Sequence, residues 1–225
     1  MKVWKYCEAR EKIQDDLDLQ EELFVTPGEL LGYFNDAIDE AEAVVHSLYE
    51  DYFLTEDSFT TADGIVRYPL PSDIFANKLR LVSLVDGCCI QPLKRIRLKD
   101  RAKMGLCMSG DVIGFDIEHR NALEGVTMRL FPDALAAGQV IQRNYIRNAN
   151  RLVDDESLID IPEGMAFIFA YVKLQCYSKE THPLIEKAVA ELDFQRKALA
   201  IVLSAMVPDG DNFIEPDLGF YTDHI

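Results

Sequence analysis

Residues 26–54, TPGELLGYFNDAIDEAEAVVHSLYEDYFL, decide the fold because they carry a long and regular apolar pattern. Thr26 is predicted to be an N-cap, Pro27 takes the first helical position, and Glu29 completes a capping box. Apolar residues then recur at steps of three and four, which predicts one apolar stripe on a helix of about 24 residues. The stripe consists of Leu30, Leu31, Phe34, Ala37, Ile38, Ala41, Val44, Val45, Leu48, Tyr49 and Tyr52.

The opposite face of this predicted helix is acidic. It carries Asp36, Asp39, Glu40, Glu42, Glu50 and Asp51 and no basic residue. The segregation of charge continues along the chain, whose formal net charge is −16. Residues 1–60 hold 16 acidic residues against 4 basic ones, whereas residues 67–151 hold 14 basic residues against 8 acidic ones. Either these are solvated faces that keep the protein soluble, or subunits of an oligomer pack acidic surface against basic surface.

The region after the long helix has the pattern of strands. Phe59–Ala62 and Ile65–Leu70 flank Asp63-Gly64, which predicts a hairpin with an Asp-Gly turn. A second hairpin is predicted around Asp86-Gly87. The strands of this second hairpin are Lys78–Val85 and Cys88–Leu93. Three further strands are predicted at Val112–Ile117, Val126–Leu130 and Gln139–Asn148.

Helices are predicted on both sides of this β region. Before the long helix, Tyr6 to about Gln14 has the composition of a short helix. Met165–Ser178 is apolar on nearly every side, so it should be a buried helix. Another helix is expected to open at Pro183, after Thr181 or His182, and to end near Met206, because Pro208 and Gly210 cannot continue it. Its expected stripe is Leu184, Ala188, Leu192, Leu199 and Leu203.

These patterns predict an α+β fold with one domain over residues 1–206 and an extended C-terminal arm over 207–225. Within the domain, helices from residues 1–55 and 160–206 form a helical bundle, and residues 58–150 form a mostly antiparallel β insertion. The arm is acidic but carries several large apolar residues, which is typical of a segment that becomes ordered on a partner. These residues are Phe213, Ile214, Leu218, Phe220 and Tyr221.

The cysteines and the apolar runs bear on the compartment. The five cysteines are scattered and odd in number, without a C-x-x-C pair, so we expect reduced and mostly buried thiols. No apolar run approaches the roughly 20 residues needed to cross a bilayer, and residues 1–20 are dominated by charge. We therefore expect a soluble protein made in a cytoplasm, with no signal peptide and no membrane partner.

No pattern predicts catalysis, a metal or a cofactor. The group Asp15, Asp16 and Asp18 has the ligand type for a divalent ion, and Asp209–Glu215 resembles part of a calcium loop, but solvated turns explain both better. No phosphate-binding loop and no G-x-S-x-G motif occurs. The basic stretch Lys94–Lys103, with Lys94, Arg95 and Arg97, could touch nucleic acid. A subunit contact with an acidic helix is favoured, because no aromatic residues are interleaved to stack on bases.

Three segments together resemble a known family, the head-to-tail adaptor proteins of tailed bacteriophages. Tyr68-Pro69-Leu70-Pro71-Ser72-Asp73-Ile74 is similar to the family's Y-x-L-P-x-D-F signature. The strand Val140–Ile146, with Arg143, Asn144 and Tyr145, is similar to the strand that precedes the family's closing helices. In the long helix, Leu31, Phe34, Asn35, Ala37 and Ile38 match an L-x-x-x-N-x-A-x pattern. The resemblance covers roughly residues 7–206.

This resemblance implies a structural virion protein rather than an enzyme. It implies a ring of subunits, commonly a dodecamer, that sits in the neck of the virion under the portal vertex and joins it to a tail or nozzle protein. The bore of such a ring continues the channel for double-stranded DNA, which passes without specific contact. It also implies that the C-terminal arm grips the portal through Phe213, Ile214, Leu218, Phe220 and Tyr221.

Two questions stay open at this point. The acidic face, represented by Asp36, Asp39 and Glu40, could line the bore or could meet the basic region of the next subunit, represented by Lys94, Arg95 and Arg97. The second arrangement is slightly preferred, because it also accounts for the positive segment. The alternative functions are a tail-side neck protein, such as a tail terminator or stopper, and a metal-dependent or small-molecule enzyme of phage origin. The pair of closing helices argues against the first, and the enzyme would need a clustered polar pocket.

Overall fold

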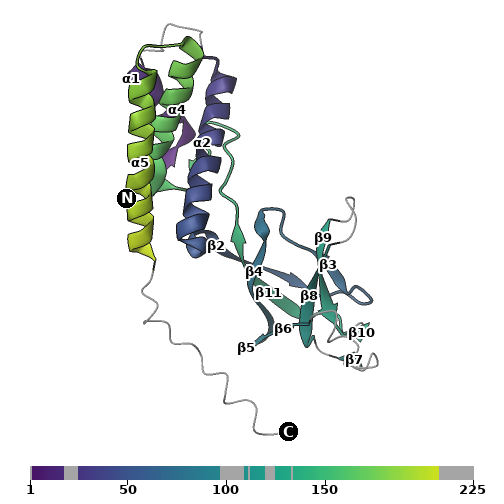
Figure 1. The fold of residues 1–225 in the computed structure, drawn as a ribbon. Helices are drawn as coiled ribbons and strands as arrows, with labels where there is room; N and C mark the ends of the chain where they lie inside the picture. Colours follow the sequence, from purple (N-terminus) through teal and green to yellow (C-terminus); the bar gives the residue numbers. More distant parts are fainter. Residues whose placement is uncertain are drawn as a thin grey trace. The chain divides into compact units, whose positions relative to one another are not determined.

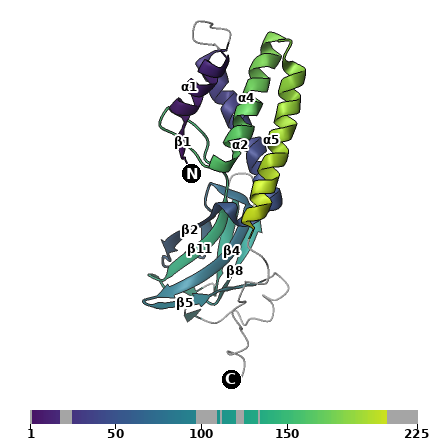
Figure 2. The ribbon, with the colours of Figure 1, turned by 90° about the vertical axis from the view of Figure 1, so that its left-hand side faces the viewer.

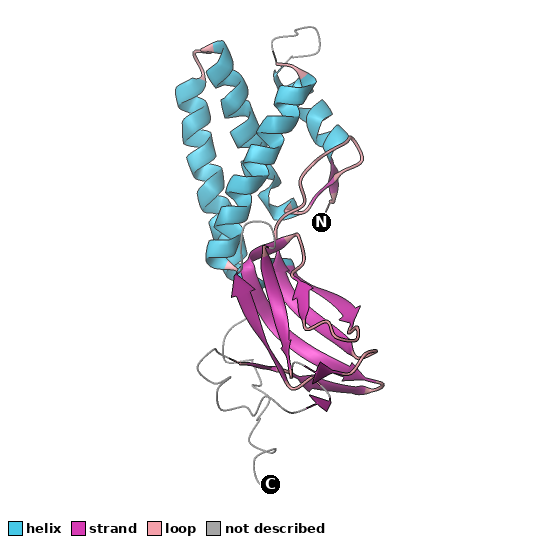
Figure 3. Cartoon of the chain, turned by 90° about the vertical axis from the view of Figure 1, so that its right-hand side faces the viewer, coloured by secondary structure: helices cyan, strands magenta, loops and turns pink. Residues whose placement is uncertain are grey.

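A computed structural model describes residues 2–17, 25–96, 109–110, 112–119, 125–132 and 134–207 of the chain (Figure 1). The chain divides into two compact units. The helical unit comprises residues 1–49 and 150–225, and the β unit comprises residues 50–149. The fold is α+β, as predicted, with the α-helices in the helical unit and both four-stranded sheets in the β unit (Figure 3).

The long acidic helix is α2, Pro27–Leu48, and its start is the predicted capping box. The Glu29 backbone N–H donates to Thr26 Oγ1 at 3.3 Å, and the Thr26 backbone N–H donates to Glu29 Oε2 at 2.8 Å. Two of the four orphan N–H groups of the first turn are thereby satisfied. The buried face of α2 consists of Leu30, Phe34, Ala37, Ile38, Ala41 and Val45.

The prediction that the apolar stripe of α2 continues to Tyr52 is wrong. Tyr49 caps the C-terminus of α2, and Tyr52 lies in a separate 3-10 helix, η1, Glu50–Phe53. Glu50 and Asp51, which were assigned to the acidic face of the helix, also lie in η1. Ion pairs with the strand residues Lys78 and Arg80 explain this change, because they hold both acids within the β unit.

The other helices of the helical unit are α1, Tyr6–Leu17, α4, Met165–Glu180, and α5, Ile185–Met206. Helix α4 packs against α2 and α5, and α1 packs against α4. Figures 2 and 3 show α1 and α5 on opposite sides of α4. As predicted, α4 is buried on most sides, through Met165, Phe167, Ile168, Phe169, Ala170, Val172 and Cys176. A short helical turn, η2, Pro162–Gly164, leads into α4.

The start of α5 differs from the prediction by two residues. Thr181 adopts a left-handed conformation, with φ of 51°, and serves as the C-cap of α4 instead of opening α5. His182 Nδ1 accepts a hydrogen bond of 3.2 Å from the Leu184 backbone N–H. Of the predicted stripe, Ala188, Leu199 and Leu203 are buried, but Leu184 is 43% exposed because it precedes the helix.

The β unit contains two four-stranded sheets. One has the order β2-β11-β4-β5 and is antiparallel throughout, and the other has the order β3-β9-β8-β6 and is antiparallel except for β6 and β8. The strands are β2, Leu54–Thr60; β3, Arg67–Pro69; β4, Ile74–Asp86; β5, Cys89–Pro92; β6, Lys94–Arg95; β8, Gly114–His119; β9, Val126–Phe131; and β11, Val140–Arg147.

Two small pairings complete the described strands. In the helical unit, β1, Trp4–Lys5, pairs antiparallel with β12, Leu158–Ile159. In the β unit, β7, Ser109–Gly110, pairs parallel with β10, Ala134–Leu135.

The first predicted hairpin is wrong and the second is confirmed. Strand β2 pairs with β11, and β3 pairs with β9, so the two strands around Asp63-Gly64 belong to different sheets. Strands β4 and β5 form the predicted hairpin, in which Asp86 is the partner of Cys89 and Gly87 adopts φ of 57°. The Asp63-Gly64 turn therefore moves the chain from one sheet to the other.

The core of the β unit draws side chains from both sheets. It consists of Val82, Leu84, Leu93, Val112, Phe115, Met128, Leu130 and Ile141. Gly114 is required by a close approach, because a Cβ there would lie 2.4 Å from Ile96 Cδ1 and 2.6 Å from the Lys94 carbonyl oxygen. A core shared in this way ties the two sheets into one unit.

The expectation of mostly buried thiols is wrong for the described cysteines. Cys88 and Cys89 are exposed in the β4–β5 hairpin, Cys7 is partly exposed and only Cys176 is buried. All four are free thiols, as predicted. Burial raises the pKa of the Cys176 thiol to about 11, with a further contribution from Glu180, so this side chain is a neutral part of the core.

Candidate assembly surfaces

The signature segment, residues 68–74, is anchored at its first residue. The Tyr68 hydroxyl donates to the Ile65 carbonyl oxygen at 3.0 Å and accepts from the Ala62 backbone N–H at 2.9 Å. Its ring lies against that of Phe59, with the ring centroids 4.4 Å apart. Tyr68 therefore closes the turn that carries the chain between the two sheets.

Arg143, on β11, holds both the middle of this segment and the edge strand β2. Its Nη1 donates to the Pro69 carbonyl oxygen at 2.8 Å, and its Nε donates to Asp57 Oδ1 at 2.8 Å. Its Nη2 donates to Asp57 Oδ2, which makes the pair bidentate. The guanidinium also lies over the Phe59 ring, 4.7 Å from the centroid. Arg143 is 6% exposed, so these contacts are sheltered from water.

Tyr145 fixes the end of the segment. Its hydroxyl donates to the Asp73 carboxylate, at 3.0 Å from Oδ1 and 3.3 Å from Oδ2. Burial, together with this hydrogen bond to an anion, raises the pKa of the Tyr145 hydroxyl to about 12. The Asp73 carbonyl oxygen accepts from the Asn148 backbone N–H at 2.7 Å. The signature thus has a structural role, because its residues hold the connector between the sheets onto β11.

Asn35, from the pattern in the long helix, has an equivalent anchoring role in the helical unit. Its Nδ2 donates to the Leu152 carbonyl oxygen at 3.1 Å, and its Oδ1 accepts from the Leu152 backbone N–H at 2.9 Å. Leu152 is 2% exposed, so its backbone groups would otherwise be buried without a partner. Asn35 therefore fixes the returning chain on α2.

The predicted acidic site residues of α2 lie on its solvent-facing side. Arg151 donates to Asp39 Oδ2 at 2.6 Å, and Arg196, on α5, donates to Glu40 Oε2 at 2.8 Å. Asp36 is exposed and has no ion pair among the residues that the structure describes. Two of the three acids are therefore neutralised within their own chain.

The start of α2 has a further charge contact. Lys179 Nζ, near the end of α4, donates to both carboxylate oxygens of Glu29 at 2.7 Å. This bond, together with the capping-box bonds from Thr26, lowers the pKa of the Glu29 carboxyl to about 2. The contact ties the first turn of α2 to the last turn of α4.

The predicted basic residues lie in the β unit where they are described. Lys94 and Arg95 form β6 and are exposed, and Arg95 Nε donates to Asp116 Oδ1 at 3.3 Å. Arg97 lies outside the described residues, as do the arm residues Phe213, Ile214, Leu218, Phe220 and Tyr221. The structure therefore describes two of the predicted basic residues, Lys94 and Arg95, and both belong to the β unit.

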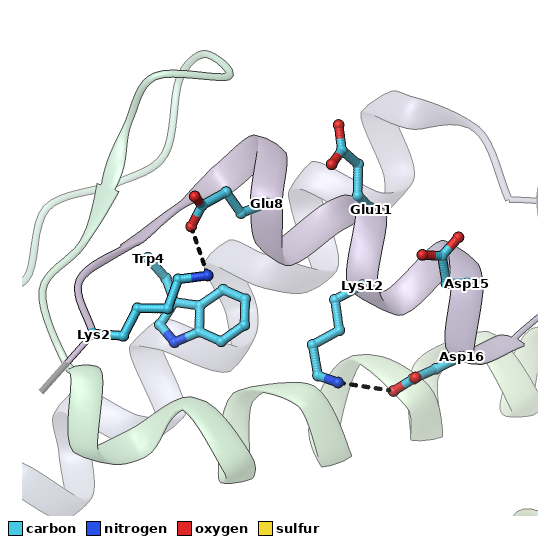
Figure 4. Close-up of a pocket in the computed structure, with 7 residues that line it drawn as sticks. All are labelled: Lys2, Trp4, Glu8, Glu11, Lys12, Asp15 and Asp16. Carbon is cyan, nitrogen blue, oxygen red and sulfur yellow. Dashed lines mark ion pairs between the residues drawn. The ribbon is translucent and has the colours of Figure 1, made fainter.

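A surface hollow of about 390 Å³ lies on the α1 side of the helical unit (Figure 4). It is lined by Lys2, Trp4, Glu8, Glu11, Lys12, Asp15 and Asp16. Lys2 Nζ pairs with Glu8 Oε2 at 3.1 Å, and Asp16 Oδ2 pairs with Lys12 at 3.8 Å and with Lys173 of α4 at 2.8 Å. The hydrogen bond from Lys173 lowers the pKa of the Asp16 carboxyl. Four carboxylates against two lysines leave the hollow acidic.

Helix α5 presents an apolar surface that sequence reasoning missed. Phe194 is 67% exposed and Ile201 is 70% exposed. With Ala198 and Ala205 they lie on the face opposite the buried residues Ala188, Leu199 and Leu203. The available signal was that α5 has apolar residues on two faces, whereas only one of them can face the core.

Two further observations bear on chemistry and location. Within the described ranges, no three His, Cys, Asp or Glu side chains are grouped so that they could hold a metal ion. Asp18 and the stretch Asp209–Glu215 lie outside those ranges. No helix in the described part of the chain has the length and apolar character of a membrane span.

Comparison with known proteins places the chain in a family. No curated protein matches it. The family model described as SU10 adaptor protein matches residues 6–211, which include α1, α2, the whole β unit, α4 and α5. This family is one of head-to-tail adaptors of phages, which are structural virion proteins, so the adaptor resemblance is confirmed. The chain belongs to the SU10 adaptor protein family.

Proposed function

We propose that the protein forms a ring that joins the portal vertex to the tail and continues the DNA channel. Family membership over residues 6–211 carries this proposal. Anchors formed by Asn35, Arg143 and Tyr145 support it, because they rigidify the segments through which the chain resembles head-to-tail adaptors. A ring that transmits DNA needs such rigid subunits, with helices α2, α4 and α5 acting as one bundle.

The C-terminal arm is proposed to bind the portal. Its residues Phe213, Ile214, Leu218, Phe220 and Tyr221 have the apolar character to fill pockets, and its acids suit basic rims. One arm from each subunit gives avidity without a large single interface.

We assign the acidic face of α2 to the channel. Asp39 and Glu40 have partners in Arg151 and Arg196 of their own chain, so neither needs a basic neighbour. Asp36 adds an exposed negative charge, which repels phosphate and keeps DNA from adhering. Lys94, Arg95 and Arg97 remain candidates for a subunit contact. If the acidic face instead meets a neighbour's basic strands, raising the salt concentration should dissociate the ring, because such contacts are screened.

Electron microscopy of intact particles tests the main proposal. The expected result is a closed ring of this chain directly under the portal, and heads without tails when the gene is deleted. A ring at the far end of the neck would indicate a tail-side neck protein instead. Absence of the chain from the neck would overturn the proposal.

Truncation of residues 208–225 tests the arm. The truncated chain should keep the circular dichroism spectrum and the urea midpoint of the full chain but fail to co-purify with the portal. A second variant separates the apolar side chains from the length of the arm. The full-length chain with Phe213→Ser and Phe220→Ser should bind the portal more weakly, although the chain is not shortened. Unfolding of the truncated chain would show that the arm belongs to the core.

A further inference from the structure

The exposed face of α5 has the composition of an interface. Phe194 and Ile201 are seven residues apart, about 10.5 Å along the helix axis, and Ala190, Ala198 and Ala205 surround them. Small residues around two large apolar ones form a surface that a partner can approach closely. An apolar stripe of this kind on a solvent face marks a site of interaction.

Two lysines lie along the same face. Lys187 and Lys197 are exposed, and neither has an ion pair among the described residues, whereas the adjacent Arg196 is engaged by Glu40. They are separated by ten residues, or about 15 Å of helix. The α5 face, defined as Lys187, Ala190, Phe194, Lys197, Ala198, Ile201 and Ala205, therefore combines an apolar centre with two lysines. The exposed acids Glu191 and Asp193 lie at its borders.

The α1 side of the helical unit offers the complementary surface. The hollow there contains carboxylates at Glu8, Glu11 and Asp15, which span about 10.5 Å along the exposed face of α1. The ring of Trp4 lines the hollow, with its centroid 5.4 Å from that of Phe169 in an edge-on contact. Lys2 Nζ lies over the Trp4 ring, 3.8 Å from its centroid, so a partner ring must displace this exposed lysine side chain to reach Trp4 (Figure 4). Lysine side chains are long enough to bridge the difference in spacing between the two helices.

The positions of these two surfaces in the helical unit favour a second copy of the chain as the partner. Helix α4 packs against α1 on one side and α5 on the other, so the hollow and the α5 face lie on opposite sides of the unit (Figures 2 and 3). Two different, complementary surfaces on opposite sides produce head-to-tail contacts, which close into a ring when the rotation permits. A symmetric dimer would instead use one surface twice.

We propose that the α5 face of one subunit docks into the α1 hollow of the next, with Phe194 against Trp4 and the lysines against the carboxylates. This inference rests on the proposed ring, and it specifies which surfaces build it. The aromatic contact supplies most of the affinity, and the charges set the register. The acidic face of α2 stays outside this interface.

Crosslinking in the assembled neck tests the contact. The full chain carries Lys197→Cys and Glu11→Cys in a background with Cys7→Ser, Cys88→Ser and Cys89→Ser, and is co-expressed with its portal. A short bismaleimide should then produce a ladder of dimers, trimers and higher oligomers. The matched control combines Lys197→Cys with Asp36→Cys, and it should give no more crosslinking than the background chain.

A second variant gives a quantitative readout. Phe194→Glu should reduce incorporation into the neck by at least about tenfold, because loss of a central interface aromatic costs more than 1.4 kcal/mol. Its urea midpoint should stay that of the parent, since Phe194 is exposed in the isolated subunit.

The outcomes separate the two proposals. A neck ring without an α5–α1 ladder, or with Phe194→Glu incorporated normally, would overturn this inference and leave the ring intact. If a chain that carries Lys197→Cys but not Glu11→Cys crosslinked into dimers alone, the contact would be a symmetric one between two α5 helices. That result would also overturn the inference. If the parent chain is absent from the neck, the proposed function fails, and the inference fails with it.

Discussion

Arg143 on β11 and Asp57 on β2 are cross-strand partners in the sheet and also form a bidentate ion pair. The pair links the edge strand β2 to its neighbour β11, beside the carbonyl of Pro69 in the family signature. One arginine therefore joins an edge strand, a central strand and the connector between sheets.

Replacement of Arg143 by Met should lower the free energy of unfolding by about 2–3 kcal/mol. Loss of a buried pair typically costs 3–5 kcal/mol, but the Asp57 side chain is 31% exposed, which reduces the cost. Urea denaturation measures the change. The control is Arg151→Met, which removes an exposed pair and should cost less than about 1 kcal/mol. Equal effects of the two variants would contradict the assigned role of Arg143.

Replacement of Asn35 by Ala should cost roughly 2–3 kcal/mol. The change leaves the buried N–H and C=O groups of Leu152 without their partners, and each such group carries a desolvation penalty of about 1–3 kcal/mol. Asp36→Ala, on the adjacent and exposed position, should change stability by less than about 0.5 kcal/mol. Thermal or urea unfolding compares the two, and a stable Asn35→Ala would argue that water replaces the side chain.

Tyr145 should make stability depend on pH in the alkaline range. Because the pKa of Tyr145 is raised from 10.0 to about 12 in the folded state, the unfolded chain loses this proton first, and stability falls as the pH rises between these values. Tyr145→Phe should cost about 1 kcal/mol at neutral pH through the lost hydrogen bond. It should also flatten the alkaline fall in the urea midpoint. An unchanged slope would assign that fall to other tyrosines.

Glu29 should contribute to acid sensitivity. Its folded pKa is depressed from 4.5 to about 2, so its contribution is fully present above pH 4.5 and is lost as the pH falls through about 2. Glu29→Gln should therefore reduce the decline in stability over this window, and it should be less stable than the parent at neutral pH. Circular dichroism during acid titration provides the measurement, with Asp36→Asn as the exposed control on the same helix.

Replacement of side chains by alanine on the two faces of α5 should change the stability of the subunit by very different amounts. Leu203 is fully buried, and Leu203→Ala should cost about 2–5 kcal/mol. Phe194→Ala removes an exposed ring and should change the stability of the subunit by less than about 0.5 kcal/mol. A large loss of stability in Phe194→Ala would show that Phe194 is covered within its own chain.

Local rules in the sequence were sufficient for two of the helix ends. The α2 start follows from Thr26, Pro27 and Glu29, and the end of α5 follows from Pro208 and Gly210, because caps and breakers act within a few residues. The β4–β5 hairpin was predictable as well, although its two-residue turn is Gly87-Cys88 and not the predicted Asp86-Gly87.

The assembly surfaces could be predicted only in part. The acidic residues of α2 were visible in the sequence, but their neutralisation by Arg151 and Arg196 was not, because the partners lie 112 and 156 residues away. Periodicity places Phe194 and Ile201 on a second apolar face of α5, but it does not show which of the two faces is exposed. The spacing of apolar residues shows which of them share one face of a helix, but not whether another element covers that face.

The sequence by itself determined which segments are helical, where two of them begin or end, and which family the chain resembles. Tertiary structure alone decided that β2 and β3 belong to different sheets, that Tyr49 ends α2, and that α5 keeps one apolar face in solvent. The reason is physical. Caps, turns and periodicity act between near neighbours, whereas strand partners, ion pairs and burial depend on residues that only the folded chain brings together.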